Sequence, residues 1–433
     1  MWTVRIAAIP AVVMLVAWGS LQAGPAAAPN GNWPQWRGPL RDGVSTETGL
    51  LSSWPAAGPP LVWSAKGLGR GFSSVSVAGG RIFTMGDRGS AQFVIALDEE
   101  TGKELWAARV GANYNSPDDF NGPRGTPTID GGMLYALGAY SDLVAVDVAT
   151  GKERWRRNLE RDFGGQMMSG WQWSESPLVD GDNVVVTPGS NRAALVTLDK
   201  TTGKEIWRAG VPRLGPKGAD GAGYSSIVIS NGGGVKQYVQ LTGRGLVGVR
   251  ASDGRYLWGN NAVANDIANI STPIVKGNAV FASTSYDTGS VLVELAPDGH
   301  GGVTATQKYF IPPNRFQSHH GGMVLVGDYL YGGHGQSNGF PVCLDFATGK
   351  SMWSPVRNAG TGSAAVIAAD GKLYFRYQNG MVVLIDATPA GYRESGSFQI
   401  PNPFHLSWPH PVIAGGRLYL REQDALHAYN IKR

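Results

Sequence analysis

The residues of this chain that are best suited to chemistry stand in short polar segments, and two of these segments are rich in histidine. Four of the seven histidines lie there, His319 and His320 in one segment and His405 and His410 in the other. An imidazole with an unperturbed pKa of about 6.5 can act as a general base near neutral pH. Clustered histidines also fit a zinc or copper site. Plain hydrogen bonding in a channel wall is the third role that the sequence leaves open.

The other polar segments contribute acidic, amide, basic and aromatic side chains. These candidates are Arg124, Trp171, Trp173, Glu175, Tyr224 and Asn269. Either tryptophan could stack on a planar ring. Glu175 could instead form an ion pair with Arg124, and the side chain of Asn269 could cap a turn. Arg376 and Arg421 could bind an anion or satisfy backbone carbonyls.

An internal repeat places these segments at regular intervals along the chain. Its clearest copy runs from Ala96 to Trp106 and reads Ala-Leu-Asp-Glu-Glu-Thr-Gly-Lys-Glu-Leu-Trp. Further copies end at Trp155, Trp207, Trp258 and Trp353, and a degenerate copy ends at Tyr309. Upstream of the copies, a Gly or Asp turn precedes an alternating apolar strand, as in Gly79-Gly80-Arg81-Ile82-Phe83. Each unit thus has four short β runs separated by turns, which predicts one four-stranded propeller blade per repeat.

Eight units follow one another, and the last is incomplete. They lie near residues 73–110, 125–159, 174–211, 224–263, 270–310, 319–357, 362–400 and 408–430. The eighth lacks an outer strand with its tryptophan, and the segment from Pro59 to Lys66, which contains Trp63, would supply it. Closure removes two exposed sheet edges. We therefore expect an all-β fold, an eight-bladed propeller of four-stranded antiparallel blades, closed by an N-terminal strand and spanning 59–433 as a single domain.

The repeated tryptophans have a structural role in such a fold. On an outer strand each can wedge against the next blade and bury on the order of 200 Å². The glycine of the Thr-Gly-Lys turn tolerates the positive φ that the turn needs. The Gly- and Pro-rich lead over 29–58, with Trp33, Trp36 and Trp54, is expected to pack on the ring as a strap.

In a propeller, the segments that lead into the inner strands ring the central channel. Polar side chains that break the repeat at those places are the best candidates for a site. All of the candidate residues named above, except Arg376 and Arg421, stand in such lead-in segments. The sequence therefore predicts one polar site on the channel face.

The amino terminus is typical of a secretory signal peptide over residues 1–28. It has Arg5, an apolar stretch from Ile6 to Trp18, and a small-residue segment that ends at Ala28. The apolar stretch is shorter than the roughly 20 residues of a membrane span. We expect an exported chain, periplasmic or secreted, without a stable membrane anchor.

The composition excludes several classes of protein. Glycine takes 62 of 433 positions, charged residues are 16% and hydrophobic residues 42%, which indicates a turn-rich β protein rather than a disordered, coiled-coil or collagen-like chain. The net charge of +4 comes from scattered basic residues, so a nucleic-acid partner is not expected. Cys343 is the only cysteine, which excludes an intramolecular disulfide and a Cys-based zinc site. We expect a monomer stabilised by packing.

The Ala-x-Asp-x-x-Thr-Gly-Lys-x-x-Trp unit is similar to the tryptophan-docking motif of the pyrroloquinoline-quinone-type propellers. The likeness runs from about residue 33 to 433. The lead Trp33-Pro34-Gln35-Trp36-Arg37-Gly38-Pro39 resembles that of exported bacterial members. The superfamily includes quinoprotein alcohol dehydrogenases and a non-enzymatic branch that serves as an outer-membrane protein assembly scaffold, so the resemblance implies the fold more strongly than the activity.

The resemblance to the dehydrogenases implies a site for pyrroloquinoline quinone with Ca²⁺. In that family a Glu and an Asn hold the cation and an Asp is the base, and by blade order Glu175 and Asn269 would be the metal ligands. The implied quinone-binding residues are Arg124, Trp171, Trp173, Glu175, Tyr224 and Asn269. Ser318-His319-His320 stands where the base is expected, so His319 and His320 join Glu175 as catalytic candidates. The missing Asp and the missing adjacent-cysteine disulfide both argue against ordinary alcohol dehydrogenation.

Two functions follow from these patterns. One is a quinone-dependent oxidoreductase that acts on alcohols, with a small molecule or a polymer as its substrate. The other is a cofactor-free binding or scaffold propeller, in which blade edges or the channel mouth capture a protein or glycan ligand. The missing lipid-anchor cysteine argues against the membrane-assembly branch specifically, but not against binding in general.

Overall fold

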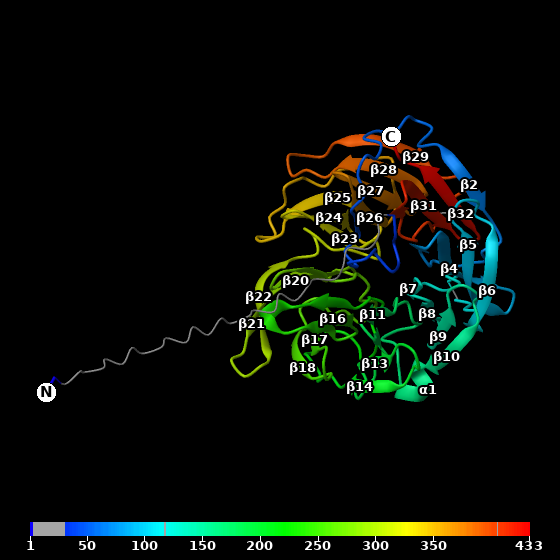
Figure 1. Ribbon diagram of the computed structural model, residues 1–433. Coiled ribbons are helices and arrows are strands. Elements are labelled where there is room, and N and C mark those ends of the chain that lie inside the picture. The colour runs from blue at the N-terminus through cyan, green and yellow to red at the C-terminus, as the bar shows by residue number, and fades with distance from the viewer. Residues whose placement is uncertain (3–30, 117, 405) are drawn as a thin grey trace.

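The computed structural model describes residues 1–2, 31–116, 118–404 and 406–433. The signal peptide predicted over 1–28 lies almost entirely on residues 3–30, and the predicted candidate His405 is also outside the described residues. The described chain forms eight β-sheets that follow one another around a ring (Figure 1). The predicted all-β, eight-bladed propeller is confirmed.

The blades have the following strands in chain order. The first five sheets are β3 Ser76–Ala78, β4 Arg81–Arg88, β5 Ala91–Asp98, β6 Glu104–Ala112; β7 Thr128–Asp130, β8 Met133–Leu137, β9 Asp142–Asp147, β10 Glu153–Asn158; β11 Leu178–Asp180, β12 Asn183–Val186, β13 Leu195–Asp199, β14 Glu205–Ala209; β15 Val228–Ser230, β16 Gln237–Thr242, β17 Gly245–Arg250, β18 Tyr256–Asn260; and β19 Ile274–Lys276, β20 Ala279–Thr284, β21 Gly289–Pro297, β22 Val303–Ile311. The last three are β23 Met323–Val326, β24 Tyr329–His334, β25 Phe340–Asp345; β1 Val44–Ser45, β26 Ala364–Ala369, β27 Lys372–Tyr377, β28 Met381–Asp386, β29 Glu394–Gln399; and β2 Leu61–Ala65, β32 Ala425–Asn430, β31 Arg417–Glu422, β30 Val412–Ala414.

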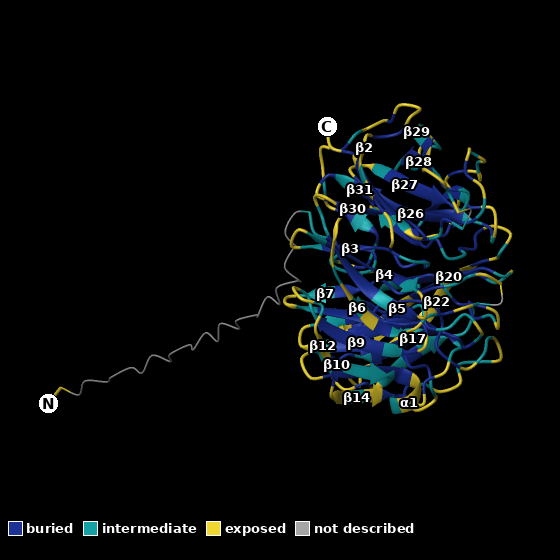
Figure 2. Cartoon of the chain, turned by 90° about the vertical axis from the view of Figure 1, so that its right-hand side faces the viewer, coloured by how far each residue is buried: buried dark blue, intermediate teal, exposed yellow. Residues whose placement is uncertain are grey.

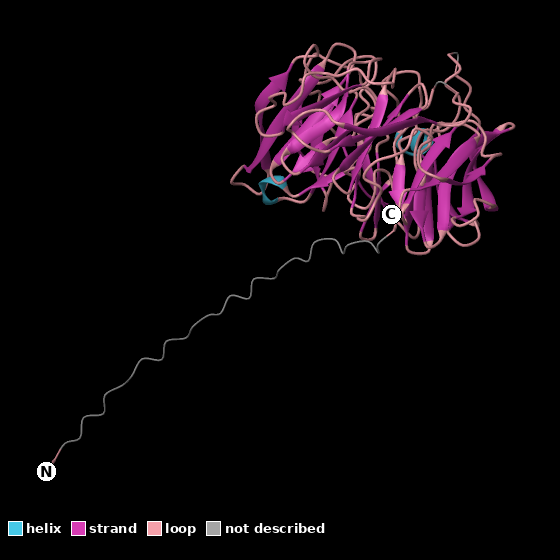
Figure 3. Cartoon of the chain, turned by 90° about the horizontal axis from the view of Figure 1, so that it is seen from above, coloured by secondary structure: helices cyan, strands magenta, loops and turns pink. Residues whose placement is uncertain are grey.

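Helix is confined to two short pieces of the described chain, α1 (Leu159–Phe163) and the 3₁₀ turn η1 (Gly232–Gly234) (Figure 3). None of the helical segments in these described residues has the length and apolar character that crossing a membrane requires. The strand interiors are buried and the exposed residues lie mainly on turns and outer edges (Figure 2). The hydrophobic core is accordingly divided among the contacts between neighbouring blades.

The N-terminal strand closes the ring as predicted. Strand β2 pairs antiparallel with β32, with Trp63 opposite Ala428, so that the blue and red ends of the chain share one sheet (Figure 1). Leu50 also forms a β-bridge with Lys432. The eighth blade is therefore built from both ends of the described propeller.

The sixth blade departs from the predicted four strands. Its sheet has only β23, β24 and β25, and the expected outer strand is reduced to a single bridge between Leu344 and Ser351. Pro355, two residues after the repeat tryptophan Trp353, has no N–H to donate to a ladder. Trp353 is nevertheless buried, so the packing role of the repeat survives where the strand is lost.

The repeat tryptophans dock on the next blade. The indole N–H of Trp155 donates to the carbonyl oxygen of Lys200 at 3.0 Å, and that of Trp207 donates to Ala251 at 3.2 Å. In the degenerate copy, the hydroxyl of Tyr309 donates to the carbonyl oxygen of Phe346 at 2.7 Å. The tyrosine therefore takes over the docking contact of the lost tryptophan.

Glycine is required where a docked ring meets the next turn. A Cβ on Gly203, at φ +67°, would lie 2.7 Å from the Trp155 ring, whereas a Cβ on Gly181, at φ +60°, would meet nothing within 4 Å. Gly203→Ala is expected to destabilise the protein by roughly 2–4 kcal/mol through clash and backbone strain, and Gly181→Ala by about 1 kcal/mol through strain alone. Denaturant unfolding of the two variants measures the difference, and equal losses would show that the ring contact is unimportant.

The lead segment crosses one end of the channel. Its backbone pairs with Val77 of the first blade through Trp33 and with Ala368 of the seventh through β1. Arg41 donates to the carbonyl oxygens of Ser176 and Pro177 in front of the third blade, and Arg37 donates to that of Met323 in the sixth. A segment that reaches blades on opposite sides of the ring must pass across its axis, so these residues form a floor beneath the channel.

Candidate functional site

A cavity of about 390 Å³ lies at the centre of the ring, above this floor. Its lining residues are Trp36, Arg37, Phe72, Phe120, Arg124, Trp171, Ser174, Ser176, Tyr224, Ser226, Ala268, Ile270, Ser271, Thr272, Tyr286, His319, His320, Gly322, Ser337, Gln378, Leu406, Trp408 and His410. Most of them stand in the segments that lead into the inner strands. Among the described residues, the lining includes aromatic, hydroxyl, imidazole and guanidinium groups but no carboxylate.

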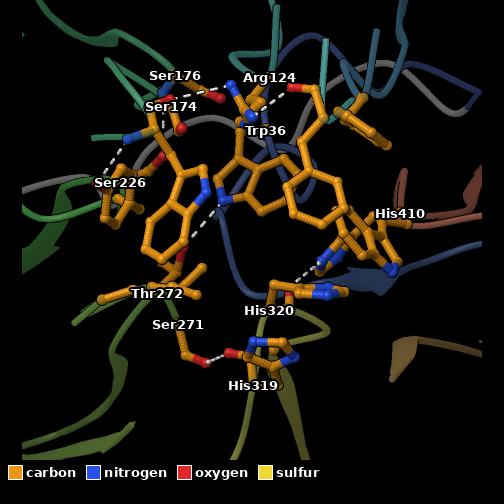
Figure 4. A pocket seen from close by; sticks show the side chains of 18 of the residues that line it. Trp36, Arg124, Ser174, Ser176, Ser226, Ser271, Thr272, His319, His320 and His410 are labelled. Atoms are coloured by element: carbon orange, nitrogen blue, oxygen red, sulfur yellow. Dashed lines mark hydrogen bonds between the residues drawn. The ribbon is translucent and has the colours of Figure 1, made fainter. Parts of the chain in front are cut away.

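Aromatic side chains from several blades and from the strap face this space. Trp408 packs near Phe72 and Phe120, with ring centroids 5.0 and 5.1 Å apart, and its centroid lies 4.6 Å from that of His320. Trp36 comes from the strap, and its indole N–H donates to the hydroxyl of Thr272 at 2.9 Å (Figure 4). These rings present flat apolar faces around the cavity.

Six of the predicted residues line the cavity, namely Arg124, Trp171, Tyr224, His319, His320 and His410. Arg124 donates to the carbonyl oxygens of Phe120 at 2.7 Å and Trp171 at 3.0 Å, and its guanidinium lies over the Tyr114 ring. The hydroxyl of Tyr224 is 2.6 Å from that of Ser169. Arg124 and Tyr224 thus hold the cavity wall in place through contacts of their own.

Glu175 is not among the lining residues. Its carboxylate is buried, and it accepts hydrogen bonds from the backbone N–H of Thr187 at 2.7 Å, from the Thr187 hydroxyl at 2.8 Å and from the Gln240 amide at 3.2 Å. It forms no ion pair with Arg124 in the described part of the chain. The neighbours Ser174 and Ser176 do line the cavity, so alternation along an extended segment turns Glu175 to the other side.

Asn269 and Trp173 also lie behind the wall. The Asn269 amide donates to the carbonyl oxygens of Thr242 at 2.9 Å and Gly243 at 3.1 Å, and its oxygen accepts from the N–H of Asn265 at 3.1 Å. Asn269 therefore bonds within a turn, which matches the alternative of a turn cap. Its neighbours Ala268 and Ile270 line the cavity. The buried indole of Trp173 donates to Thr187, away from the cavity, at 3.3 Å.

These placements bear on the calcium site that the resemblance implied. The oxygens of Glu175 and of Asn269 already accept hydrogen bonds from protein groups, and neither residue lines the cavity. Over the residues described, no three His, Cys, Asp or Glu side chains are grouped so that they could hold a metal ion. The donor set therefore does not fit a quinone-bound Ca²⁺ in the expected manner.

The three described cavity histidines are held neutral at pH 7. Burial lowers the pKa of His319 to about 4 and that of His410 to about 3, and burial with the neighbouring imidazoles also lowers the pKa of His320. Both ring nitrogens of His319 have partners, with Nδ1 2.7 Å from the Ser363 hydroxyl and Nε2 3.0 Å from the Tyr286 hydroxyl. His319 is thus a weak base that is already hydrogen-bonded.

Several lining residues escaped the sequence analysis. Trp36 and Arg37 come from the strap, and Phe72 and Trp408 are aromatic residues of lead-in segments in which Trp171 and Trp173 were the only predicted tryptophans. Trp36 and Arg37 reach the site only because the strap crosses the end of the channel, and the sequence does not show this path. Repeat-breaking aromatic residues in the lead-in segments were the missed signal.

Arg376 and Arg421 join blades instead of lining the cavity. Arg376 forms an ion pair with Glu422 at 2.5 Å and donates to the carbonyl oxygen of Pro409 at 2.8 Å. Arg421 donates to the Thr84 hydroxyl at 2.8 Å and to the carbonyl oxygen of Gly69 at 2.9 Å. Both are buried, and they satisfy protein acceptors across the seventh, eighth and first blades.

The position of Glu175 makes stability depend on pH. Burial raises its pKa to about 7, against the attraction of Arg41 and the hydrogen bonds from Thr187. The folded state then binds the proton more tightly than the unfolded state, so this group's contribution falls as pH rises from about 4.5 to 7 and costs roughly 3 kcal/mol above that window. Glu175→Gln is expected to be more stable than the natural chain at pH 8 and to lose that advantage at pH 5. Unfolding free energies at both values test this, and a pH-independent difference would contradict it.

Comparison with known proteins places the chain in a family. The repeat model described as "Outer membrane protein assembly factor BamB" matches residues 41–169 and 90–355. The chain is 24% identical over 299 residues to the outer membrane protein assembly factor BamB of Moranella endobia (strain PCIT), a match that covers 66% of this chain and 69% of that protein. It is 29% identical over 169 residues to the quinohemoprotein alcohol dehydrogenase ADH IIB of Pseudomonas putida, which covers 36% of this chain and 22% of that protein.

Solved structures show the same fold. The quinohemoprotein alcohol dehydrogenase from Comamonas testosteroni superposes with a TM-score of 0.64 at 13% identity, over 94% of this chain and 82% of that one. BamB from Moraxella catarrhalis superposes with a TM-score of 0.59 at 14% identity, over 86% of this chain and 98% of that one. At these identities the likeness concerns the fold, and it extends to both the assembly factor and the dehydrogenase. The family model, which matches more than half of the chain, shows that the chain belongs to the pyrroloquinoline-quinone-type propeller repeat family.

Proposed function

We propose that this chain is an exported binding propeller that takes a ring-bearing small molecule, or the ring at the end of a polymer, into its central cavity. The observation that carries the proposal is a 390 Å³ cavity lined by the aromatic side chains of Trp36, Phe72, Phe120, Trp171, Tyr224, Tyr286 and Trp408. Pockets of this size and character bind small molecules.

The lining chemistry narrows the class of ligand. Flat aromatic faces favour a planar ring or the apolar face of a pyranose. Hydroxyls from Ser174, Ser226 and Thr272 and the amide of Gln378 provide hydrogen-bonding groups that orient such a ring. A cationic ligand is disfavoured, because the lining contributed by the described chain contains Arg37 and Arg124 but no carboxylate.

The residues present support binding better than calcium-dependent quinone chemistry. A hard cation needs oxygen ligands, and the two that the family pattern assigns, Glu175 and Asn269, already bond to Thr187, Gln240 and Asn265. His319, which stands at the expected base position, is held neutral and weakly basic. We therefore assign no oxidative step to this cavity.

The test is calorimetric titration of the full mature chain with two neutral probes, 2-naphthamide as a planar ring and methyl β-D-glucoside as a pyranose. At least one probe is expected to bind with a Kd between about 10 μM and 1 mM, as suits a ligand of this size. Binding should persist in excess chelator. If neither probe, nor a carboxylate analogue of either, binds at millimolar concentration, the proposed function is wrong.

A protein-binding role is the second candidate, and the relationship to the assembly factors favours it. Leu61, Leu105 and Ile206 are about half exposed on outer strands, each beside or near a docked tryptophan. A partner that covers these apolar residues should be released when all three are replaced by lysine, with probe binding in the cavity unchanged. Crosslinking in the periplasm of an expressing bacterium, followed by repetition with the purified partner, measures this.

A further inference from the structure

The guanidinium of Arg37 is buried at the floor of the cavity with two of its three nitrogens unused. The residue is 2% exposed and lines the cavity. Nη2 donates to the carbonyl oxygens of Asp42, at 2.7 Å, and Met323. Nε and Nη1 are buried and have no hydrogen-bond partner among the described residues. Buried polar groups, and charged ones above all, are nearly always paired, so this arrangement indicates a missing partner.

The surroundings of Nη1 identify the place where that partner would sit. A Cβ on Gly322 would lie 2.7 Å from Nη1 of Arg37 and 3.3 Å from Cε1 of His410. Nη1 and the His410 ring therefore flank the same glycine, which also lines the cavity. Glycine at this position keeps the space next to the guanidinium open.

Two more unpaired imidazole nitrogens belong to the same cavity, and the one on His410 is an acceptor because its Nε2 carries the proton. His320 Nε2 and His410 Nδ1 are buried without a hydrogen-bond partner in the described chain. His410 Nε2 is 3.0 Å from the carbonyl oxygen of His320, which holds the two histidines together (Figure 4). A neutral imidazole donates from one nitrogen, so the His320 ring can add an N–H bond to a group held by Arg37.

Arg37 is only partly balanced by charge, because the Asp42 carboxylate of the described chain attracts it from beyond ion-pair distance. It takes part in no ion pair within 4 Å there, and the nearby Asp42 accepts its hydrogen bond through the backbone while its carboxylate accepts from the N–H of Val44. Burial lowers the pKa of Arg37 only to about 10, which leaves it charged at pH 7. Arg124, the other cavity arginine, already donates to two carbonyl oxygens.

We propose that Arg37 binds a carboxylate carried by the ring-bearing ligand, with His320 beside it as a second donor. This inference rests on the proposed function, because the acidic group would be anchored at the floor while its ring packs against the aromatic walls. A single free guanidinium matches a monoanion. The ligand class is therefore a ring acid, either an aromatic carboxylate or an acidic sugar.

The experiment compares matched acid and neutral probes by calorimetry on the full mature chain. The pairs are 2-naphthoate with 2-naphthamide, and methyl β-D-glucuronide with methyl β-D-glucoside. In one pair the acid is expected to bind at least about 10-fold more tightly, because a charge-assisted hydrogen bond replaces an unsatisfied buried donor. The pair that shows the preference distinguishes an aromatic acid from an acidic sugar.

Variants locate the preference. Arg37→Gln is expected to reduce the ratio of acid to neutral affinity to about one, whatever the affinity of the variant for the neutral probe. Arg41→Gln is the matched control, since Arg41 is a buried arginine of the same strap that donates to Ser176 and Pro177 and does not line the cavity. It should leave the ratio unchanged. An equal loss in both variants would overturn the inference, because the effect would then come from the strap.

The remaining outcomes separate this inference from the proposed function. Equal binding of acid and neutral probes would overturn the carboxylate site and leave the cavity's role intact, whereas binding of no probe would overturn both. A crystal structure of the natural chain with the preferred acid bound tests the same inference without any substitution. The carboxylate is expected within hydrogen-bonding distance of Arg37 Nε or Nη1, and a carboxylate placed on Arg124 or in solvent would refute the inference.

Discussion

Replacing strand β2, Leu61–Ala65, with a flexible Gly-Ser segment of the same length is expected to lower the stability of the protein more than the same replacement of any other outer strand. The edit removes the docked Trp63, a loss worth roughly 3–5 kcal/mol on its own. It also leaves the edge of β32 unpaired and disconnects the eighth blade from the start of the chain. An open ring exposes two sheet edges, which promotes association between chains. We expect a chain that elutes as aggregates or melts at least about 10 °C lower.

The matched control is the same replacement of β14, Glu205–Ala209. That strand is also five residues long, carries the docked Trp207 and forms the outer edge of its blade, but it does not join the ends of the ring. The control chain should remain monomeric and lose less stability. Size-exclusion chromatography and thermal melting measure both, and equal behaviour of the two chains would show that closure contributes nothing beyond ordinary strand packing.

Replacing Trp408 with alanine is expected to weaken binding of the preferred cavity probe by at least about 10-fold. Trp408 packs near Phe72, Phe120 and His320 at the cavity wall, and its indole N–H donates to Gln378 at 3.1 Å. Removing it deletes a flat stacking face, and the loss of stacking and burial amounts to roughly 1.5–3 kcal/mol of binding free energy. Calorimetry measures the affinity, and a melting curve shows that the variant is folded.

Trp207→Ala is the control variant, which is expected to lose stability but not probe affinity. Trp207 is a docking tryptophan that donates to Ala251 on the outside of the ring and does not line the cavity. Its removal should lower stability by about 3–5 kcal/mol and leave probe affinity unchanged at a temperature where the variant is folded. If Trp408→Ala binds the probe as tightly as the natural chain, the probe binds outside the aromatic cavity.

Much of the fold could be predicted because the repeat carries its own packing rule. Each repeat tryptophan docks on the next blade, so the number of tryptophans and Gly turns predicts the number of blades. The sequence therefore predicted eight blades, and it predicted that the strand containing Trp63 closes the ring. The sixth blade could not be predicted in full, since Trp353 kept its docking role while its strand was lost before Pro355. A repeat tryptophan can pack on the next blade even where its own strand does not form, so the repeat motif predicts the packing better than the strand pairing.

The candidate site was predicted to the correct segments but not always to the correct side chains. Ser174 and Ser176 face the cavity while Glu175 between them faces Thr187, and Ala268 and Ile270 face it while Asn269 faces Thr242. Extended backbone turns successive side chains to opposite sides. The sequence alone does not say which of the two sides is the channel, and Glu175 and Asn269 were predicted from blade order in the family resemblance. The residues at the floor of the cavity could not be predicted, because the strap that supplies them lies outside the repeats and its path does not follow from the repeat pattern.

The most direct test of a binding cavity without a calcium site is uptake of pyrroloquinoline quinone by the purified chain, measured as absorbance retained after gel filtration, with Ca²⁺ or with excess chelator. We predict that Ca²⁺ makes no difference to the amount of quinone retained, and that Glu175→Gln behaves like the natural chain. Stoichiometric uptake that requires Ca²⁺ and is abolished by Glu175→Gln would contradict the cavity described here.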